Sequence, residues 1–275
     1  MATLGKKDKD RKDGAVTELD LVDKAYSTFA DIPQIFQLTQ LTRLTLSHNK
    51  IKVVPANIAE LANLEILTLW NNQIEELPTS ISAMPRLKVL NVGMNRLWNL
   101  PRGFGAFPAL EVLDLTYNNL SEKGLSGNFF IMETLRALYL GDNDFETLPS
   151  DIRNLKNLQI LVLRDNDLVY LPKEIGELVR LRELHIQGNR LTILPPEIGR
   201  LDLVGSKQVF RMENNPWVPA IAHHLQNGVA HVLEYLRTEE GRYLYERHAF
   251  AGGPPPPKTN DKSKKISRQH KQPGC

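Results

Sequence analysis

Four aspartates at matching positions are the residues of this chain whose spacing most resembles paired catalytic acids. Asp142 and Asp144 flank one asparagine, and Asp165 and Asp167 flank another asparagine 23 residues later. Two carboxyl groups held close together can act as general acid and general base. Because the same DND phrase recurs at one spacing, we expect these carboxylates to line a solvated edge of a repeated structure instead of a catalytic centre.

Three histidines and one cysteine are the other candidates for metal or nucleophilic chemistry. His223, His224 and His231 fall on one predicted helical stretch, but no cysteine or carboxylate stands at a spacing that completes a zinc site. The single cysteine, Cys275, is the last residue and has no predicted base near it. The phosphate-binding and metalloprotease motifs GxxxxGK(S/T), GxGxxG and HExxH are absent from the sequence. We therefore predict no enzyme, no metal site and no cofactor.

Composition narrows the classes of partner. Of the 275 residues, 41% are hydrophobic and 24% are charged, which is typical of a soluble protein with a core. The 34 lysines and arginines nearly balance the 32 acidic residues. The net charge therefore gives the protein no strong electrostatic attraction to nucleic acid or to a membrane surface. No apolar run is long enough to span a bilayer, and residues 1–13 do not resemble a signal peptide. These features predict a cytoplasmic protein without disulfides.

The elements that position these residues follow from a repeat of about 23 residues. Each copy fits the phrase LxxLxLxxNxI, as in Leu41, Leu44, Leu46, Asn49 and Ile51. This spacing is that of the leucine-rich repeat and predicts a short strand in each copy, stacked in parallel with its neighbours. A Leu-Pro step further on predicts a helical or 3₁₀ turn on the opposite, convex side. The asparagines that close the phrase are Asn49, Asn72, Asn95, Asn118, Asn143, Asn166 and Asn189.

A structural role is predicted for these seven asparagines. A side-chain amide can satisfy backbone groups of the neighbouring coil, so we expect a buried, hydrogen-bonded ladder. The fourth repeat is two residues longer, and residues 121–128 are predicted to form a small loop excursion. The fold class is therefore an α/β solenoid, a leucine-rich repeat horseshoe with a parallel sheet on its concave face.

The ends of the solenoid need covers, because an open terminal repeat would expose its leucines. Lys24 replaces the asparagine in an atypical first repeat, and a helical stretch follows Trp217. The predicted organisation is a disordered N-terminus at 1–14, an atypical repeat or cap at 15–40, seven repeats at 41–206, a degenerate last repeat with cap helices at 207–250, and a disordered basic tail at 251–275.

The concave face is the predicted binding surface. Aromatic residues and arginine are enriched in protein-binding hot spots, whereas some aromatics only stack within a sheet. The acids among them suggest a partner that carries lysine or arginine. The basic tail could contact acidic lipid, nucleic acid or an import receptor, or it could only aid solubility. The candidate binding residues are Trp70, Asn91, Met94, Asp114, Tyr117, Tyr139, Asp142, Arg164 and Asp165.

Several segments resemble the Ras suppressor family of leucine-rich repeat proteins. They include NNQIEELPT at 71–79, PALEVLDLTYNNLSE at 108–122, ENNPW at 213–217 and NDKSKKISR at 260–268. The resemblance implies a non-enzymatic scaffold of focal adhesions or muscle attachment sites that restrains Ras and Jun-kinase signalling. It implies binding to the last LIM domain of PINCH, and through it to integrin-linked kinase and parvin, by a protein that is monomeric on its own.

The same resemblance singles out part of the concave face. It implies that Asn91, Asp114, Tyr139 and Arg164 contact the partner, and it places Trp70 where the family has phenylalanine. The alternative is a leucine-rich repeat regulator that binds a Ras-type GTPase or a phosphatase directly.

Overall fold

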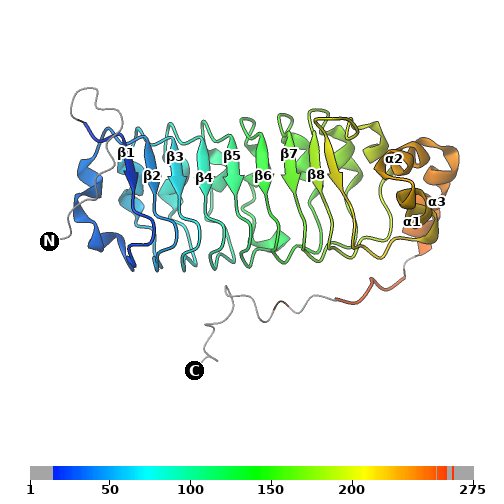
Figure 1. Cartoon of the computed structure of the whole chain (residues 1–275), viewed down its shortest axis with the longest axis horizontal. Helices are drawn as coiled ribbons and strands as arrows, with labels where there is room; N and C mark the ends of the chain where they lie inside the picture. Colours follow the sequence, from blue (N-terminus) through cyan, green and yellow to red (C-terminus); the bar gives the residue numbers. More distant parts are fainter. Residues whose placement is uncertain (1–14, 252, 259–261, 263–275) are drawn as a thin grey trace.

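One parallel sheet runs the whole length of the molecule. The computed structural model describes residues 15–251, 253–258 and 262. Its strands pair only with their sequence neighbours, in the order β1 to β9, and Figure 1 shows them side by side from one end to the other. They are β1 (Glu18–Asp20), β2 (Arg43–Thr45), β3 (Ile66–Thr68), β4 (Val89–Asn91), β5 (Val112–Asp114), β6 (Ala137–Tyr139), β7 (Ile160–Val162), β8 (Glu183–His185) and β9 (Val209–Arg211).

The register of the sheet follows the repeat phrase. Each strand is three residues long, and its central residue points into the core while its two flanking residues face solvent. Leu19 of β1 pairs with Leu44 of β2, and Leu184 of β8 pairs with Phe210 of β9, so the atypical first and last copies keep the register. The predicted solenoid fold is confirmed.

The convex side is built from 3₁₀ turns. In five repeats the residue before the turn is a proline with extended backbone, as at Pro55 and Pro172, because the pyrrolidine ring fixes φ near its helical value while ψ stays extended. The turns are η1 (Phe29–Asp31), η2 (Pro33–Gln37), η3 (Ala56–Glu60), η4 (Thr79–Ala83), η5 (Phe104–Ala106), η6 (Glu122–Gly124), η7 (Phe129–Ile131), η8 (Ser150–Asn154), η9 (Lys173–Glu177) and η10 (Pro196–Arg200).

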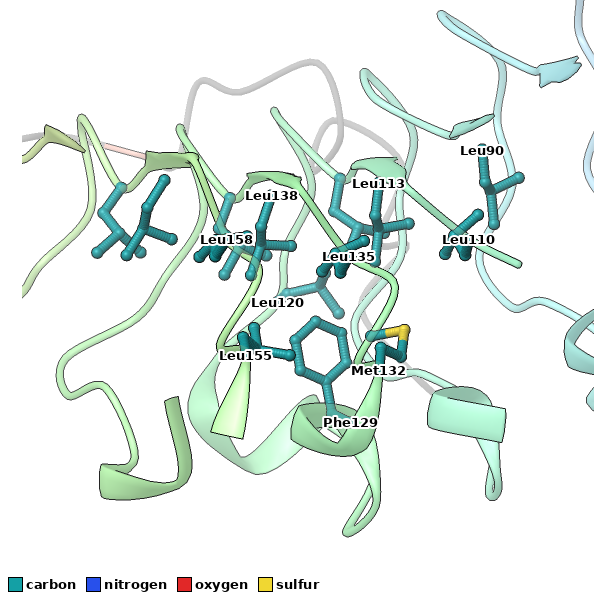
Figure 2. Packing of buried hydrophobic residues seen from close by; sticks show 14 of the residues in the cluster. Leu90, Leu110, Leu113, Leu120, Phe129, Met132, Leu135, Leu138, Leu155 and Leu158 are labelled. Carbon is teal, nitrogen blue, oxygen red and sulfur yellow. The ribbon is translucent and has the colours of Figure 1, made fainter. Parts of the chain in front are cut away.

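The longer fourth repeat carries two such turns, η6 and η7, where its neighbours carry one. Phe129 of η7 is fully buried and stacks on Phe104 of η5, with ring centroids 6.3 Å apart and planes 8° apart. Figure 2 shows the Phe129 ring beneath the leucines of neighbouring coils, close to Met132 and Leu155. The two extra residues therefore allow the fourth repeat to bury an additional aromatic ring in the core. The loop predicted at residues 121–128 is ordered and contains the turn η6.

The asparagine ladder is present and buried. Asn118 shows its geometry: its side-chain amide donates to the carbonyls of Val92 and Leu115, and its side-chain oxygen accepts from the backbone N–H of Leu97. Two of those three backbone groups belong to the preceding coil, so each asparagine joins its own repeat to the one before it. Asn49 closes the first coil in the same way by accepting from the N–H of Lys24. The ladder prediction is confirmed.

Three helices close the C-terminal end: α1 (Pro219–Gln226), α2 (Val229–Arg237) and α3 (Glu239–Ala251). Helix α2 packs on η10, and the Arg237 side chain donates to the carbonyl of Gly199 at 2.5 Å. The indole N–H of Trp217 donates to the carbonyl of Met212 at 2.9 Å, and the partly buried ring packs against the end of the hydrophobic core. Within the described residues, no helix is long and apolar enough to cross a bilayer.

Candidate protein-binding face

The candidate site is the solvent face of the sheet, which we call the concave face. It consists of the residues on either side of each central strand leucine and the two residues before each ladder asparagine. The nine residues predicted from the sequence all lie on it, between β3 and β7. They are half-buried, which leaves atoms of each side chain open to a partner.

Two large side chains on this face lie over glycines of adjacent repeats. A Cβ atom on Gly93 would come within 2.3 Å of the Trp70 ring, and a Cβ atom on Gly141 would come within 3.1 Å of the Arg164 side chain. Because these two positions lack a side chain, Trp70 and Arg164 can pack flat against the sheet. Their side chains are therefore already ordered, so they lose little conformational entropy when a partner binds.

The residue before each ladder asparagine has a left-handed backbone in every repeat. Most of these positions hold aspartate, asparagine, histidine or glycine, which tolerate a positive φ. Met94, with φ at 53°, and Tyr117, with φ at 58°, are the exceptions, and they occupy consecutive repeats in the middle of the face. For such residues the left-handed conformation costs roughly 1–2 kcal/mol. The fold therefore holds two large side chains on this face against a local preference.

Arg164 and two aspartates form one ionic cluster. An Nη1 atom of Arg164 lies 2.6 Å from Asp142 Oδ2 and 2.6 Å from Asp165 Oδ2. Burial opposes the charge on Arg164, but the hydrogen bonds and charges of Asp165 and Asp142 outweigh it and raise the pKa of the guanidinium. The cluster has a net charge of −1, so a cationic group of a partner fits it best.

The expectation of a solvated carboxylate edge is wrong for Asp167, whereas the Asp165 side chain is 41% exposed. Asp142 and Asp165 are part-buried in the arginine cluster, and the Asp167 side chain is only 6% exposed. Asp144 and Asp167 face a lysine from the far end of the chain, Lys262. Nothing in the sequence pattern indicated this contact, because the lysine lies 95 residues beyond Asp167.

Asn91, Asp114 and Tyr139 stand in line across β4, β5 and β6, paired in register. Asn91 accepts from the N–H of Gly93, and Asp114 accepts from the N–H of Thr116, so each side chain is oriented by one local hydrogen bond. Burial, followed by the charges of Glu183 and Asp114, raises the pKa of Tyr139. The hydroxyl therefore stays protonated and can donate to a partner.

An apolar stripe on the concave face was missed by sequence reasoning. It consists of the residue before each central leucine and runs without a break over five strands. A charged row borders it one residue earlier, where Lys88 pairs with Glu65 at 2.8 Å. The signal was available in the second variable position of LxxLxL, which is apolar in these five repeats. The apolar stripe is Ile66, Val89, Val112, Ala137 and Ile160.

The C-terminal part of the face carries unsatisfied polar atoms. Among the described residues, His185 Nε2 and Gln187 Oε1 are buried without a hydrogen-bond partner. Burial, and then the charge of Arg211, lower the pKa of His185, although Glu183 acts in the opposite direction. The neutral form of His185 is therefore favoured, and its Nε2 lies 3.8 Å from Glu183 Oε2.

The histidines of the cap do not converge. The rings of His223 and His224 are in edge contact, His224 stacks on Tyr235, and His231 lies 3.7 Å from Glu234. Within the part of the chain that the structure describes, no three histidine, cysteine, aspartate or glutamate side chains are placed to hold a metal. Cys275, residues 1–14 and most of the predicted tail lie outside the described residues.

Comparison with known proteins agrees with this architecture. The family model described as a leucine-rich repeat region matches residues 15–125 and 103–227. Ras suppressor protein 1 of Homo sapiens is 70% identical over 252 residues, which are 92% of this chain and 91% of that protein. The chain belongs to the Ras suppressor protein family. The protein of the same name from Bos taurus is 69% identical over the same length.

A solved structure shows the same fold at greater distance. A leucine-rich repeat protein of Leptospira interrogans superposes with a TM-score of 0.60 and 32% identity, over 77% of this chain and 58% of that one. As a member of the Ras suppressor protein family, the chain is a non-enzymatic, protein-binding leucine-rich repeat scaffold. The family resemblance inferred from the sequence is confirmed.

Proposed function

We propose that the concave face binds the C-terminal LIM domain of PINCH, and that this contact places the protein in the adhesion assembly with integrin-linked kinase and parvin. The proposal combines the family membership with the geometry of the face. A LIM domain carries zinc of its own, so the scaffold needs no metal to bind it. Restraint of Ras and Jun-kinase signalling at adhesion sites would follow from membership of that assembly.

The observation that carries the proposal is the left-handed backbone at Met94 and Tyr117. Strain of this kind persists where the surrounding structure enforces it, and it clusters at sites that bind. Asparagine or glycine at these two positions would relieve the strain, as Asn71 and Gly188 do at the same position of other repeats. The two large side chains are therefore best explained by contacts that they make with a partner.

The rest of the face has the anatomy of an interface. Protein interfaces place apolar and aromatic groups at the centre and charged groups at the rim. Here the apolar stripe lies between the charged row of Glu65 and Lys88 and a second row, at the other end of the strands, that holds Trp70 and the Arg164 cluster. Because the sheet is rigid, these groups are ordered before binding and lose little entropy on association.

The test is calorimetric titration of a purified, zinc-loaded LIM domain into the Tyr139→Ala/Arg164→Ala variant. We expect an affinity at least about 30-fold weaker than that of the wild type, because central aromatic and arginine residues contribute about 2 kcal/mol or more. The matched control is Tyr170→Ala/Arg153→Ala, which removes the same residue types from exposed positions away from the concave face. Circular dichroism checks that both variants are folded.

Equal affinity in the folded double variant and the wild type would refute the site. Titration with a Ras-type GTPase in its two nucleotide states separates the alternative function. A tight complex that depends on the nucleotide, with no LIM-domain binding, would replace the proposal with a direct regulator of the GTPase.

A further inference from the structure

A second surface lies along the edge of the solenoid, at the residue after each ladder asparagine. This position holds Asp144 and Asp167 in two consecutive repeats and Arg190 in the next, whereas the four earlier repeats have basic or neutral residues there. Glu146 lies two residues beyond Asp144. We call the set of residues Asp144, Glu146, Asp167 and Arg190 the edge groove, as a name for these four side chains and the surface they share.

The edge groove encloses a lysine. Lys262 Nζ donates to the carbonyl of Asn143 at 2.5 Å and to Asp167 Oδ2 at 2.9 Å, and it lies 3.7 Å from Asp144 Oδ1. The side chains of Lys262 and Asp167 are only 8% and 6% exposed. An ammonium group so deeply buried needs a carboxylate and further hydrogen bonds to offset its lost hydration. This site provides both.

A second lysine and a backbone group contact the same groove. Lys258 Nζ lies 2.5 Å from Glu146 Oε1 and 4.0 Å from Asp167 Oδ2. Arg190 donates twice to the carbonyl of Pro256, from Nε at 2.6 Å and from an Nη atom. The groove therefore contacts two lysine side chains and one backbone carbonyl of the same segment. These three contacts specify both the charges that the groove recognises and the direction in which the segment is bound.

The segment between helix α3 and Lys258 is suited to reaching the edge groove. His248, near the end of α3, is hydrogen-bonded to the Thr192 hydroxyl at 2.8 Å, so the segment starts beside the solenoid. Figure 1 shows the described residues 253–258 running back from α3 beneath the sheet. Four consecutive prolines, 254–257, favour the extended polyproline conformation and have little conformational entropy to lose on docking.

We propose that the edge groove is a binding site for a proline–lysine segment, and that Pro256, Lys258 and Lys262 of this chain occupy it in cis. The site is separate from the concave face, and the proposal does not depend on the LIM-domain contact. Tethering gives the cis segment an effective concentration in the millimolar range. A free peptide of the same sequence therefore competes poorly until the cis lysines are removed.

The test uses a fluorescent peptide with the sequence of residues 253–265 and measures its anisotropy against the full chain. The Lys258→Gln/Lys262→Gln variant keeps the whole chain but neutralises its own two anchors. We expect this variant to bind the peptide at least about 10-fold more tightly than the wild type, because the tethered competitor is weakened. A peptide with glutamine in place of both lysines should not bind.

Carboxylate variants in the Lys258→Gln/Lys262→Gln background identify the groove. Asp167→Asn should lower peptide affinity at least about 10-fold, and the exposed Glu146→Gln, which does not threaten the fold, should lower it several-fold. Glu177→Gln on the convex turn η9 is the matched control and should change nothing. Equal peptide affinity in wild type and lysine variant, no binding to the lysine variant, or binding that survives both Asp167→Asn and Glu146→Gln would each overturn the proposal.

Discussion

The concave face and the asparagine ladder lie side by side in every repeat, yet they are built by opposite rules. The ladder repeats one contact: each asparagine bonds to backbone groups of its own coil and of the coil before it. The large side chains of the concave face do not repeat their contacts from coil to coil. Trp70 over Gly93 and Arg164 between two aspartates each occur once.

This difference separates stability from recognition within a single repeat. Each coil has too small a core to be stable alone, so the periodic contacts hold the stack together. A side chain that occurs once adds little to that stack, and Met94 and Tyr117 even act against it. Substitutions in the ladder should therefore mainly change the free energy of unfolding, and substitutions of exposed side chains on the face should mainly change partner affinity.

The largest effect is expected from the ladder. Asn118→Ala leaves the N–H of Leu97 buried without its partner and removes one donor each from the carbonyls of Val92 and Leu115, which keep the amides of Asn95 and Asn143. The free energy of unfolding should fall by about 2–3 kcal/mol. Asn91→Ala loses only one local hydrogen bond, to Gly93, and should cost less than about 1 kcal/mol. Urea unfolding of both variants measures the contrast. Similar losses in the two would break the distinction between ladder and face.

A smaller effect is expected where the concave face is packed. Gly93→Ala adds a Cβ atom within 2.3 Å of the Trp70 ring, so the ring must move at a cost of about 1–2 kcal/mol. Thermal unfolding measures the loss, which should largely vanish in a Trp70→Ala background. A loss of the same size without the tryptophan would show that the contact between ring and glycine is not its cause.

The smallest effect concerns pH. Burial and Arg211 lower the pKa of His185 in the folded state, so the unfolded chain binds that proton more readily. Its contribution to stability is therefore complete above the ordinary histidine pKa of about 6.5 and is lost as the pH falls through the folded value. Urea unfolding at several pH values should show a gentler acid decline for His185→Gln than for the wild type.

The periodic part of the molecule could be predicted from the sequence. The leucine spacing predicted the strands and their register, the Leu-Pro steps predicted the turns, and Asn118 and its equivalents predicted the ladder. Each of these features depends on contacts within one repeat or between adjacent repeats. The concave positions of the candidate residues followed from the same register. The apolar stripe could have been predicted too, since Val89 and Val112 stand at one fixed position of the phrase.

The contacts that occur once could not be predicted. The packing of the Trp70 ring on Gly93 depends on the side-chain conformation of Trp70, which the repeat pattern does not specify. The left-handed backbone of Met94 and Tyr117 is imposed by the coil against the preference of the residues. The burial of Asp167 by Lys262 joins residues 95 positions apart across a stretch with no periodic relation to the repeats.

The most direct test of the central claim is to relieve the strain at both exceptional positions. In the Met94→Asn/Tyr117→Asn variant, the asparagines suit the left-handed backbone, so the free energy of unfolding should stay the same or rise by up to about 1 kcal/mol. Titration with the LIM domain should at the same time show an affinity at least about 10-fold weaker than that of the wild type. An unchanged affinity in this folded variant would contradict the claim that the face holds these side chains for recognition.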